Sequence, residues 1–553
     1  MTPTQIQALL REHGLRPSKA LGQHFLADTN MAAHIVRLAG VQPGDRVVEV
    51  GPGLGSLTLA LCEAGASVRA VELDRRLADA LATVVEGKPV EIVQADALTV
   101  DWPELLADGD HWIMVSNLPY NVATPVLMGA LERAPMIDRF LVMVQREVGE
   151  RLAAVPGTKA YGAVSVKVAY YARAELVGAV PASVFVPKPK VVSALVRMDR
   201  REEQAIAVAD PERMFELVRA GFSTRRKMLR RVLSAELGPD AEATLRMAGI
   251  DPAARAETLQ LPEWSALAQT VATGAPPECR LEAGAKLTLS LRVVGTRDDG
   301  YHEIDAFVVA VSEPHDEIVL RPAIAPSLSV AGPQGSGVPL GDENLALRAA
   351  RGLGANVGIE LYKGIPMGAG LGGGSVDAAA VLIGAPRLAG IDVDSGDLDR
   401  FAASLGADVP FCLAAAGPMR VRGIGDDLAR VTLPPFAVVI ATPPFGCSTE
   451  AVYRAWDTLG GPVGDNVEID GLPPLRNDLE RAAHAVEPRL AAFKVLVEHA
   501  AGSPALLAGS GSSYALLFAT TAEAEAARAR IGEVVEGHIV VGHTIDACVR
   551  IVS

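Results

Sequence analysis

The first half of the chain alternates short runs of β-branched residues with stretches of helical periodicity. Residues 46–50 (Arg-Val-Val-Glu-Val) predict a strand, a glycine-rich turn follows at 51–55, and residues 56–64 predict a helix. Further strands are predicted to end at Glu72, Val93 and Val115. Strands that alternate with helices in this way predict a parallel, doubly wound α/β sheet. From about Pro211 to Thr273 the pattern is wholly helical and predicts a small helical lobe.

The second half has a pattern of α+β type. Alternating or apolar runs predict strands within 286–294, 306–320, 437–442 and 514–519. A glycine-rich loop at 366–375 leads into a predicted helix through Leu388. Between the halves, residues 273–278 carry turn formers in series without apolar periodicity, which predicts a linker. No internal repeat relates the halves, so we expect two unrelated folding units in one chain.

Composition places the chain among globular proteins, since 49% of its 553 residues are hydrophobic and 21% are charged. No apolar run reaches the roughly 18 residues that cross a bilayer, and the first residues lack the apolar core of a signal peptide. The five cysteines are scattered and form no CxxC pair, which is typical of a reducing compartment. We therefore expect a cytoplasmic protein with no membrane partner and no metal held by protein ligands alone.

The net charge of −15 is unevenly distributed along the chain. Residues 1–275 carry 30 Lys and Arg against 32 Asp and Glu, whereas residues 276–553 carry 21 against 34. Within the first half, residues 151–231 hold 16 basic against 7 acidic side chains. A local basic excess is typical of a nucleic-acid partner, so the overall acidity does not exclude one.

The glycine-rich turn at 51–55 predicts a ligand site at the N-terminus of the following helix. Its glycines are spaced GxGxG, unlike the GxGxxG of dinucleotide-binding loops, and Glu49 lies two residues before the first of them. A carboxylate there suits S-adenosylmethionine, which carries a sulfonium and an ammonium group. Glu72 and Asp96, at successive strand ends, are placed to accept from ribose hydroxyls and from an adenine amino group. For the loop alone, a turn without a ligand is the alternative.

The fourth predicted strand leads into Asn117-Leu-Pro-Tyr120. The Asn117 amide oxygen and the Leu118 carbonyl could accept the two hydrogens of an exocyclic base amine, while Tyr120 could stack on the ring. An amine held in this way attacks the sulfonium methyl directly and needs no strong general base. Taken alone, the same four residues are also compatible with an ordinary turn.

Four segments in order together resemble the ribosomal RNA adenine N6-dimethyltransferase family: LGQHFL at 21–26, the loop at 51–55, NLPY at 117–120 and FVPKPKVVS at 185–193. The resemblance covers about residues 15–270. It implies a Rossmann-like α/β methyltransferase that dimethylates two adjacent adenosines near the 3′ end of 16S rRNA. The cofactor site that it implies consists of His24, Leu26, Gly51, Glu72, Asp96 and Asn117. Asn117 and Tyr120 would be catalytic, and Tyr120 and Phe185 would flank the flipped adenine.

His24 stands where many members of this family have Asn, and either side chain can hydrogen-bond the cofactor. Erythromycin-resistance methylases of large-subunit rRNA share the catalytic core, but FVPKPKVVS and the helical tail favour the small-subunit enzyme. Basic residues would then contact RNA phosphates, namely Lys188, Lys190, Arg225, Arg226, Lys227, Arg230 and Arg231. A solvated helical face is the alternative for each of them.

The loop at 366–375 (PMGAGLGGGS) lacks the GK[ST] of a Walker P-loop, but its five glycines before a helix can present backbone N–H groups to phosphates. A flexible hinge is the alternative for the loop alone. Its neighbours, AKLTL at 285–289, DGYH at 299–302, LGADVPF at 405–411 and AGSGS at 508–512, resemble the GHMP kinases in sequence and order. This superfamily contains galactokinase, homoserine kinase, mevalonate kinase and phosphomevalonate kinase.

The DGYH and GADVPF forms most resemble 4-diphosphocytidyl-2-C-methyl-D-erythritol kinase of the non-mevalonate isoprenoid pathway, over about residues 280–553. The resemblance implies a two-lobed α+β kinase that phosphorylates the 2-hydroxyl of that substrate with ATP and Mg²⁺. ATP would bind to Pro366, Met367, Gly368, Ala369, Gly370, Leu371, Gly372, Gly373, Gly374, Ser375 and Val376. Asp408 would be the catalytic base, Lys286 would support it or the transferring phosphoryl group, and Tyr301 and His302 would lie beside the cytosine.

Three positions depart from this kinase family. Thr288 replaces a common Asn, Ala369 replaces a Gly and is compatible with the loop only at negative φ, and Val376 removes a possible hydroxyl near the metal. Alternative hypotheses are therefore a folded interaction module without kinase activity or a GHMP kinase for another substrate. For the first half, the alternative is a binding factor in ribosome assembly.

The sequence thus predicts a bifunctional enzyme with five segments. They are an S-adenosylmethionine-dependent methyltransferase domain at 1–200, a helical RNA-binding lobe at 201–272, a linker at 273–279, and the N-terminal and C-terminal lobes of a GHMP kinase at 280–432 and 433–553.

Overall fold

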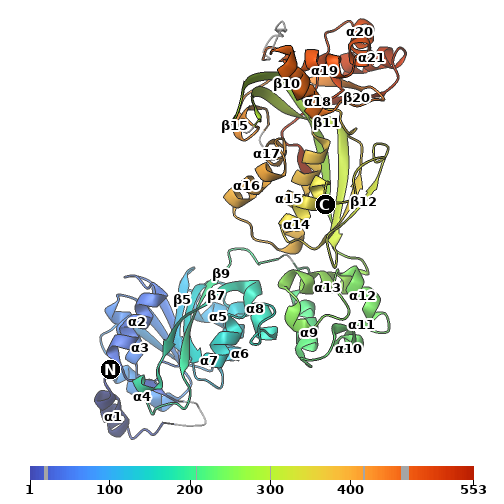
Figure 1. The fold of residues 1–553 in the computed structure, drawn as a ribbon. Coiled ribbons are helices and arrows are strands. Elements are labelled where there is room, and N and C mark those ends of the chain that lie inside the picture. Colours follow the sequence, from blue (N-terminus) through green and yellow to red (C-terminus); the bar gives the residue numbers. More distant parts are fainter. Residues whose placement is uncertain (18–22, 207, 299, 415–416, 462–472, 553) are drawn as a thin grey trace. The chain divides into compact units, whose positions relative to one another are not determined.

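The computed structural model describes residues 1–17, 23–206, 208–298, 300–414, 417–461 and 473–552. The motif residues Leu21, Gly22 and Asp299 therefore lie outside the described residues. The chain forms two compact units, of which one comprises residues 1–242 and 252–268 and the other residues 243–251 and 269–553 (Figure 1). The division thus falls a few residues before the predicted linker, of which residues 274–278 form neither helix nor strand.

The first unit is built on a central sheet with helices on both faces. Its strands are β1 (Phe25–Leu26), β2 (Arg46–Val50), β3 (Ser67–Glu72), β4 (Val90–Gln94), β5 (Trp112–Asn117), β6 (Ile137–Gln145), β7 (Ala172–Val180), β8 (Phe185–Val186) and β9 (Ser193–Arg200). The helices that precede β9 in the chain are α1 (Pro3–Glu12), α2 (Thr29–Ala39), α3 (Ser56–Glu63), α4 (Arg75–Val84), α5 (Trp102–Leu105), α6 (Ala123–Arg133), α7 (Arg146–Leu152), α8 (Ala163–Tyr171) and the 3₁₀ helix η1 (Ala182–Val184).

The main sheet has the strand order β4-β3-β2-β5-β6-β9-β7. The first five strands of this order are parallel, which confirms the predicted doubly wound sheet. The last two strands are antiparallel, because β9 pairs in that sense with both β6 and β7. The sheet is therefore mixed, and the antiparallel edge is a feature that the strand–helix rhythm did not predict.

Alternation of side chains along the strands separates two cores. Val48 and Met114 face the core that α5, α6 and α8 cover, whereas Val47 and Val115 face the core under α2, α3 and α4. Consecutive residues of a strand point to opposite faces, and a parallel sheet covered on both faces needs apolar residues on both. This explains why the strands read as continuous apolar runs, and it leaves the carboxyl ends of the strands as the open edge.

The helical region predicted after Pro211 is confirmed. Its helices are α9 (Pro211–Phe222), α10 (Leu229–Val232), α11 (Ser234–Leu237), α12 (Ala241–Met247), η2 (Ala256–Thr258) and α13 (Leu261–Thr273). Trp264 of α13 is fully buried against α9, with its ring 6.1 Å from that of Phe222. A Cβ at Gly221 would lie 2.5 Å from the Trp264 ring, so glycine is required for this close approach.

The second unit contains a 12-stranded sheet and is of α+β type, as predicted. Its strands are β10 (Cys279–Thr296), β11 (His302–Pro322), β12 (Ser327–Ala331), β13 (Val357–Tyr362), β14 (Met419–Gly423), β15 (Asp427–Arg430), β16 (Ala437–Thr442), β17 (Arg476–Asn477), β18 (Leu506–Leu507), β19 (Tyr514–Phe518), β20 (His538–Ile545) and β21 (Val549–Ile551). Its helices are α14 (Leu345–Gly352), α15 (Gly373–Ala389), α16 (Ser395–Leu405), α17 (Val409–Leu413), α18 (Thr449–Leu459), α19 (Glu480–Val486), α20 (Arg489–Ala501) and α21 (Thr521–Gly532).

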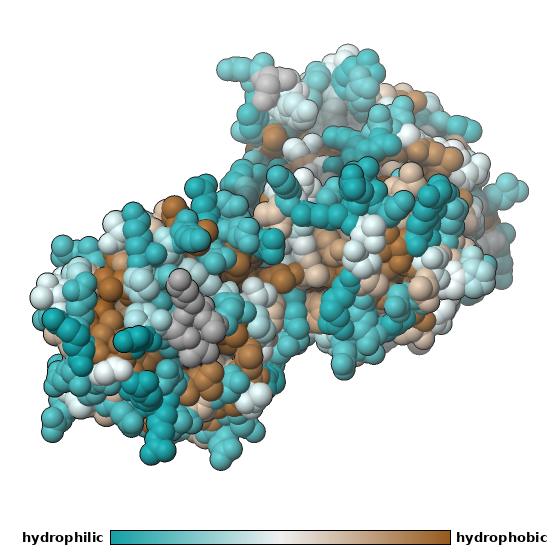
Figure 2. Space-filling view, turned by 90° about the horizontal axis from the view of Figure 1, so that it is seen from below, coloured by the Kyte–Doolittle hydropathy of each residue, from teal (hydrophilic) through white to brown (hydrophobic). Residues whose placement is uncertain are grey.

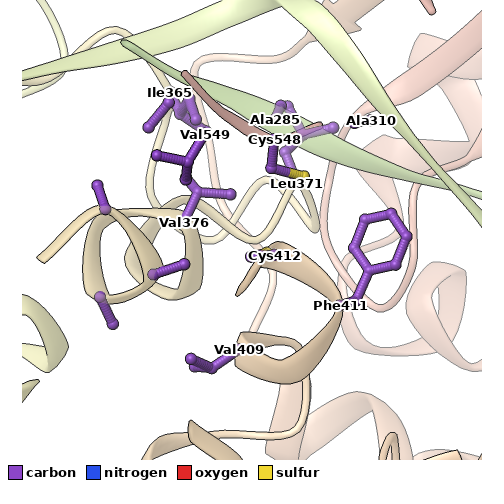
Figure 3. Packing of buried hydrophobic residues seen from close by; sticks show 14 of the residues in the cluster. Ala285, Ala310, Ile365, Leu371, Val376, Val409, Phe411, Cys412, Cys548 and Val549 are labelled. Carbon is purple, nitrogen blue, oxygen red and sulfur yellow. The ribbon is translucent and has the colours of Figure 1, made fainter. Parts of the chain in front are cut away.

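Helix α15 is the centre of the larger core of this unit. It lies against the long antiparallel strands β10 and β11 and against α14 and α17. Its alanines at 378–380 are fully buried, because a helix covered on several sides has no polar face. Figure 3 shows Val376 at the start of this helix among apolar side chains that include Ile365, Leu371 and Val549. A second core lies between β16, β19 and helices α18 to α21.

Hydrophilic residues cover most of the face seen in Figure 2, with apolar residues exposed between them. No helix among the described residues has the length and apolar character that a membrane span requires.

Candidate functional sites

One cavity of the first unit lies at the carboxyl ends of the parallel strands. It gathers all six residues predicted for the cofactor, namely His24, Leu26, Gly51, Glu72, Asp96 and Asn117. Ligands of open α/β sheets bind outside the carboxyl ends of the strands, so the motifs converge here although they are up to 93 residues apart. Their convergence is a fact of the fold, and the identity of the ligand that they hold stays a prediction.

The glycine turn between β2 and α3 has a backbone that other residues rarely adopt. Gly51, Gly53 and Gly55 have φ values of 70°, 57° and 85°. A Cβ at Gly53 would lie 2.9 Å from the Phe25 ring, so this glycine is also required by close packing. The Gly53 N–H donates to the Glu72 carboxylate at 3.2 Å, which links the turn to the end of β3.

Two buried carboxylates, Glu49 and Glu72, line this cavity. Burial raises the pKa of Glu49 to about 8, although the Thr58 hydroxyl, which donates to it at 2.7 Å, acts in the opposite direction. Burial also raises the pKa of Glu72. A nearby cation would favour the ionised form of both groups. The two buried carboxylates of the cavity therefore fit a ligand that carries positive charge, such as S-adenosylmethionine.

The NLPY segment, at the carboxyl end of β5, lines the same cavity. The Asn117 amide nitrogen donates to the His24 carbonyl at 3.1 Å, and its amide oxygen is then the atom that can accept from a base amine. The Tyr120 hydroxyl and the Ser193 hydroxyl are 2.6 Å apart, and the Tyr120 ring is stacked 5.8 Å from that of His24. Burial raises the pKa of Tyr120, so the phenol stays protonated at neutral pH. Ser193 had no predicted role, and its hydroxyl holds this ring in place.

Phe185 is placed differently from the other predicted residues. It pairs with Leu26 in the short β1–β8 ladder, is 3% exposed, and belongs to the core under α2 and α3. It does not line the cavity, so in this structure its ring has no open face for a base. A stacking role would require Phe185 to leave the core.

The residues predicted to contact RNA are mostly on the surface. Lys188, Lys190, Arg225, Arg226, Lys227 and Arg231 are exposed, and Arg230 is half-buried. Arg225 donates to the Tyr161 carbonyl at 3.0 Å, and Arg230 forms an ion pair with Glu242 at 2.7 Å. These two have structural partners, whereas Arg226 and Lys227 extend from an exposed turn between α9 and α10.

A cavity of the second unit joins the predicted kinase residues Lys286, Tyr301, His302, Ser375 and Asp408. The Lys286 ammonium lies 3.2 Å from the Asp408 carboxylate, which directly precedes α17. The Lys286 side chain is 9% exposed and that of Asp408 is 46% exposed, so the carboxylate can meet a substrate while the lysine supports it. The Lys286 ammonium also donates to the Thr288 hydroxyl at 3.4 Å.

The glycine-rich loop lines a second cavity, which contains residues 366–374, Asn344, Lys363 and Asp377. Three loop carbonyls are occupied elsewhere: Gly368 accepts from Ser512 N–H at 3.3 Å, Ala369 from Ser513 N–H at 3.2 Å and Leu371 from Lys286 N–H at 3.1 Å. The GSGS segment thus holds the carbonyl side of the loop. A loop whose carbonyls are bonded on one side is suited to present N–H groups on the other.

Close packing explains one glycine in each of the two segments, the glycine-rich loop and GSGS. A Cβ at Gly370 would lie 1.8 Å from the Ala508 carbonyl, and one at Gly511 would lie 1.9 Å from Gly370 N. Ala369 does not have a positive φ, so an alanine is compatible with the loop at this position.

The beginning of α15 separates the two cavities, since Ser375 lines the cavity with Asp408 and Gly373 and Gly374 line the loop cavity. Val376 is fully buried and lines neither (Figure 3). A side chain at this position points into the core, so the loss of a hydroxyl there removes no group from either cavity.

An aromatic pocket surrounds His302, and sequence reasoning missed most of it. The His302 ring lies 4.8 Å from that of Tyr453 and 5.5 Å from that of Trp456, and its Nε2 is 2.7 Å from the Asp457 carboxylate. These partners come from α18, about 150 residues further along the chain, and no motif in the sequence linked that segment to His302. Tyr301 is 63% exposed at the rim.

Comparisons with known proteins match the two halves of the chain to two different families. The family model for ribosomal RNA adenine dimethylase matches residues 15–273, and the model for the GHMP kinase N-terminal domain matches residues 344–415. Ribosomal RNA small subunit methyltransferase A of Streptomyces griseus is 48% identical over 275 residues, which cover 48% of this chain and 94% of that protein. The protein of the same name from Thermobifida fusca is 47% identical over 277 residues, which cover 49% and 95%.

A solved structure of 4-(cytidine 5′-diphospho)-2C-methyl-D-erythritol kinase is 34% identical, covers 48% of this chain and 98% of its own, and superposes with a TM-score of 0.40. Fold, sites and family matches define a methyltransferase domain followed by a kinase domain of the GHMP class. The chain belongs to the ribosomal RNA adenine dimethylase family through its first half. A methyltransferase of this kind uses S-adenosylmethionine, and a GHMP kinase uses ATP.

Proposed function

We propose that the first half dimethylates N6 of two adjacent adenosines near the 3′ end of 16S rRNA. The observation that carries this proposal is that Glu72, Asp96, Asn117 and Tyr120 all line one cavity. S-adenosylmethionine supplies an electrophilic methyl group when it is bound. The chain's own part is to orient the target amine through the Asn117 oxygen and the Leu118 carbonyl, and to hold the base against the Tyr120 ring.

Methylation of small ribosomal subunits that lack this modification tests the proposal directly. We expect labelled S-adenosylmethionine to label two adjacent adenosines of 16S rRNA, and we expect Asn117→Ala to reduce the rate by about 100-fold or more. Asn30→Ala, which alters an exposed asparagine of α2 outside this cavity, is the control and should leave the rate unchanged. Labelling confined to large-subunit rRNA, or binding to the small subunit without methylation, would refute the assignment.

The affinity for S-adenosylmethionine should depend on pH through Glu49. Without a ligand this carboxyl has a pKa of about 8, and a cation beside it favours the ionised form, so binding releases a proton. Affinity should therefore rise by up to about 50-fold between about pH 6 and about pH 8 and then level off. Titration calorimetry of the wild type and Glu49→Gln separates this effect from titration of the ligand's own ammonium group. Equal slopes for both proteins would rule out Glu49 as the cause.

Binding of RNA should depend on the basic turn between α9 and α10. We expect Arg226→Ala/Lys227→Ala/Arg231→Ala to weaken rRNA binding about tenfold at moderate salt and to lower the slope of log affinity against log salt. Affinity for S-adenosylmethionine should not change, because these residues are remote from its cavity. Filter binding at several salt concentrations measures the affinity for rRNA and the slope of that affinity against salt. An unchanged salt slope would show that these residues form only a solvated surface.

We propose that the second half phosphorylates the 2-hydroxyl of 4-diphosphocytidyl-2-C-methyl-D-erythritol with ATP. The Lys286–Asp408 pair at 3.2 Å carries this proposal, together with the aromatic side chains of Tyr301, His302 and Tyr453, which line the same cavity and can stack on a pyrimidine. Asp408 would accept the proton of the acceptor hydroxyl as the hydroxyl oxygen forms a bond to the terminal phosphorus of ATP. The bond from that phosphorus to the bridging oxygen breaks and ADP leaves, while Lys286 would stabilise the negative charge.

Magnesium would accompany ATP in this reaction. No group of three His, Cys, Asp or Glu suited to a metal occurs among the described residues. Mg²⁺ that accompanies a nucleotide is usually held by substrate phosphates and water, with one or two carboxylates.

A kinase assay on the purified full chain tests the substrate assignment. We expect turnover of 4-diphosphocytidyl-2-C-methyl-D-erythritol with Mg-ATP, and loss of turnover in Lys286→Ala. Homoserine, mevalonate and galactose serve as comparison acceptors. Phosphorylation of one of these instead would indicate a GHMP kinase of another specificity, and no phosphorylation by a folded chain would favour an interaction module.

A further inference from the structure

Three buried charged residues lie beside the glycine-rich loop and have no role in the chemistry described above. Lys363 follows β13, Asp316 belongs to β11 and Asp377 belongs to α15, and they are 2%, 0% and 3% exposed. The Lys363 ammonium forms an ion pair with Asp316 and another with Asp377 at 2.7 Å. Charges this deeply buried lose hydration, which makes such a network a poor source of stability alone.

This network connects the two ends of the loop. Asp316 accepts from the backbone N–H groups of Gly364 at 2.7 Å and Ile365 at 2.8 Å, directly before the loop begins. Asp377 lies in the second turn of α15, directly after the loop ends. A Cβ at Gly373 would lie 2.9 Å from the Lys363 ammonium, so the cation also touches the first residue of the helix. Lys363 therefore fixes the chain that enters the loop relative to the chain that leaves it.

Asp377 has a second feature that a purely structural ion pair would not need. Its other carboxylate oxygen, Oδ1, is buried and meets no hydrogen-bond partner among the described residues. Asp377 and Lys363 both line the loop cavity. The network holds two carboxylates for one ammonium, and burial raises the pKa of Asp377.

We propose that Asp316, Lys363 and Asp377 are positioning residues for the nucleotide, which hold the glycine-rich loop in the conformation that receives the triphosphate. The inference rests on the proposed function in so far as this loop binds ATP. Five glycines give the loop a large conformational freedom, which must be restricted before its N–H groups converge on phosphate. The GSGS segment restricts the middle of the loop, and the buried network restricts its ends.

Variants of Asp377 in the full chain test the proposal. Asp377→Leu removes the bond to Lys363, and we expect the Kd for a fluorescent ATP analogue and the KM for ATP to rise about tenfold or more. Asp377→Asn keeps an oxygen of similar position that can accept from Lys363, so we expect values within about threefold of the wild type. The KM for the acceptor substrate and the rate of methylation should be unchanged in both. Such a split between ATP and the acceptor is not expected from a general loss of stability.

A matched control comes from the same strand as Asp316. Asp305 of β11 forms an ion pair with Arg420 at 2.6 Å and contacts no part of the loop. Asp305→Asn should therefore leave the Kd for the ATP analogue unchanged, even where its melting temperature falls as far as that of Asp377→Leu.

Each outcome of these measurements decides the inference. A folded Asp377→Leu that binds the ATP analogue as the wild type does would overturn it. If Asp377→Leu does not fold, Lys363→Met/Asp377→Asn takes its place, since Asp316 keeps its two N–H donors, and an unchanged Kd there would overturn it equally. Nucleotide binding that depends on Asp377 without phosphorylation of the diphosphocytidyl substrate would support the inference and refute the substrate assignment. A wild-type chain that binds no nucleotide would refute both.

Discussion

Replacing Asp408 with asparagine should reduce the rate of phosphorylation by about 1,000-fold and leave methylation within about twofold of the wild type. Asparagine has the shape of aspartate but can neither accept the hydroxyl proton nor balance the charge of Lys286, which lies 3.2 Å away. ATP binding should change little, because the loop cavity does not contain Asp408. Steady-state kinetics with the diphosphocytidyl substrate, beside a methylation assay on the same preparation, measure both activities.

The control for this variant is Asp427→Asn, which alters an exposed carboxylate of the same half, paired with Arg422. It should leave both activities unchanged. Full phosphorylation by Asp408→Asn would show that the lysine–aspartate pair is structural. Loss of methylation as well would show that the two sites are not independent.

The reciprocal experiment is Glu72→Ala, which should weaken S-adenosylmethionine binding by about 100-fold or more and abolish methylation, with no effect on phosphorylation. Glu72 accepts from Gly53 N–H at 3.2 Å and from Asp74 N–H at 3.0 Å. The substitution therefore removes an acceptor for the ligand and also releases the glycine turn and the beginning of α4. Calorimetric titration of the cofactor measures the affinity, and a melting curve measures the cost to the fold.

Glu72→Gln keeps one oxygen that can accept, so we expect an intermediate loss of affinity. Asp79→Ala, an exposed carboxylate on the adjacent α4, is the matched control and should bind S-adenosylmethionine normally. Cofactor affinity that survives in Glu72→Ala would mean that the ribose is held by other residues of the cavity.

Local patterns in the sequence were sufficient to predict the parallel strands and the residues that gather at their carboxyl ends. Glu72 and Asp96 could be found because each lies at the carboxyl end of a predicted strand, and parallel strands end at one edge. The antiparallel strands β7 and β9 were missed, because β7 is an edge strand that buries few residues and shows no clear alternation.

Contacts between distant segments were beyond sequence reasoning. Tyr453 reaches His302 from a helix about 150 residues away, and Asp316, Lys363 and Asp377 meet only when three elements pack together. Phe185 was assigned from a motif, but its burial depends on the β1–β8 ladder, which two-residue strands do not reveal in a sequence. The roles of all these residues stay predictions that the variants above can test.

The last strand of the second unit has a consequence for how two such enzymes come to share one chain. Strand β21 pairs with the beginning of β10, where Ile551 lies opposite Leu281, so the first and last strands of the kinase half are neighbours in its sheet. A domain whose two ends meet at one place can be joined to another protein through either end without any change to its core. A chain joined before residue 279 therefore leaves the strand pairing of the kinase half uninterrupted.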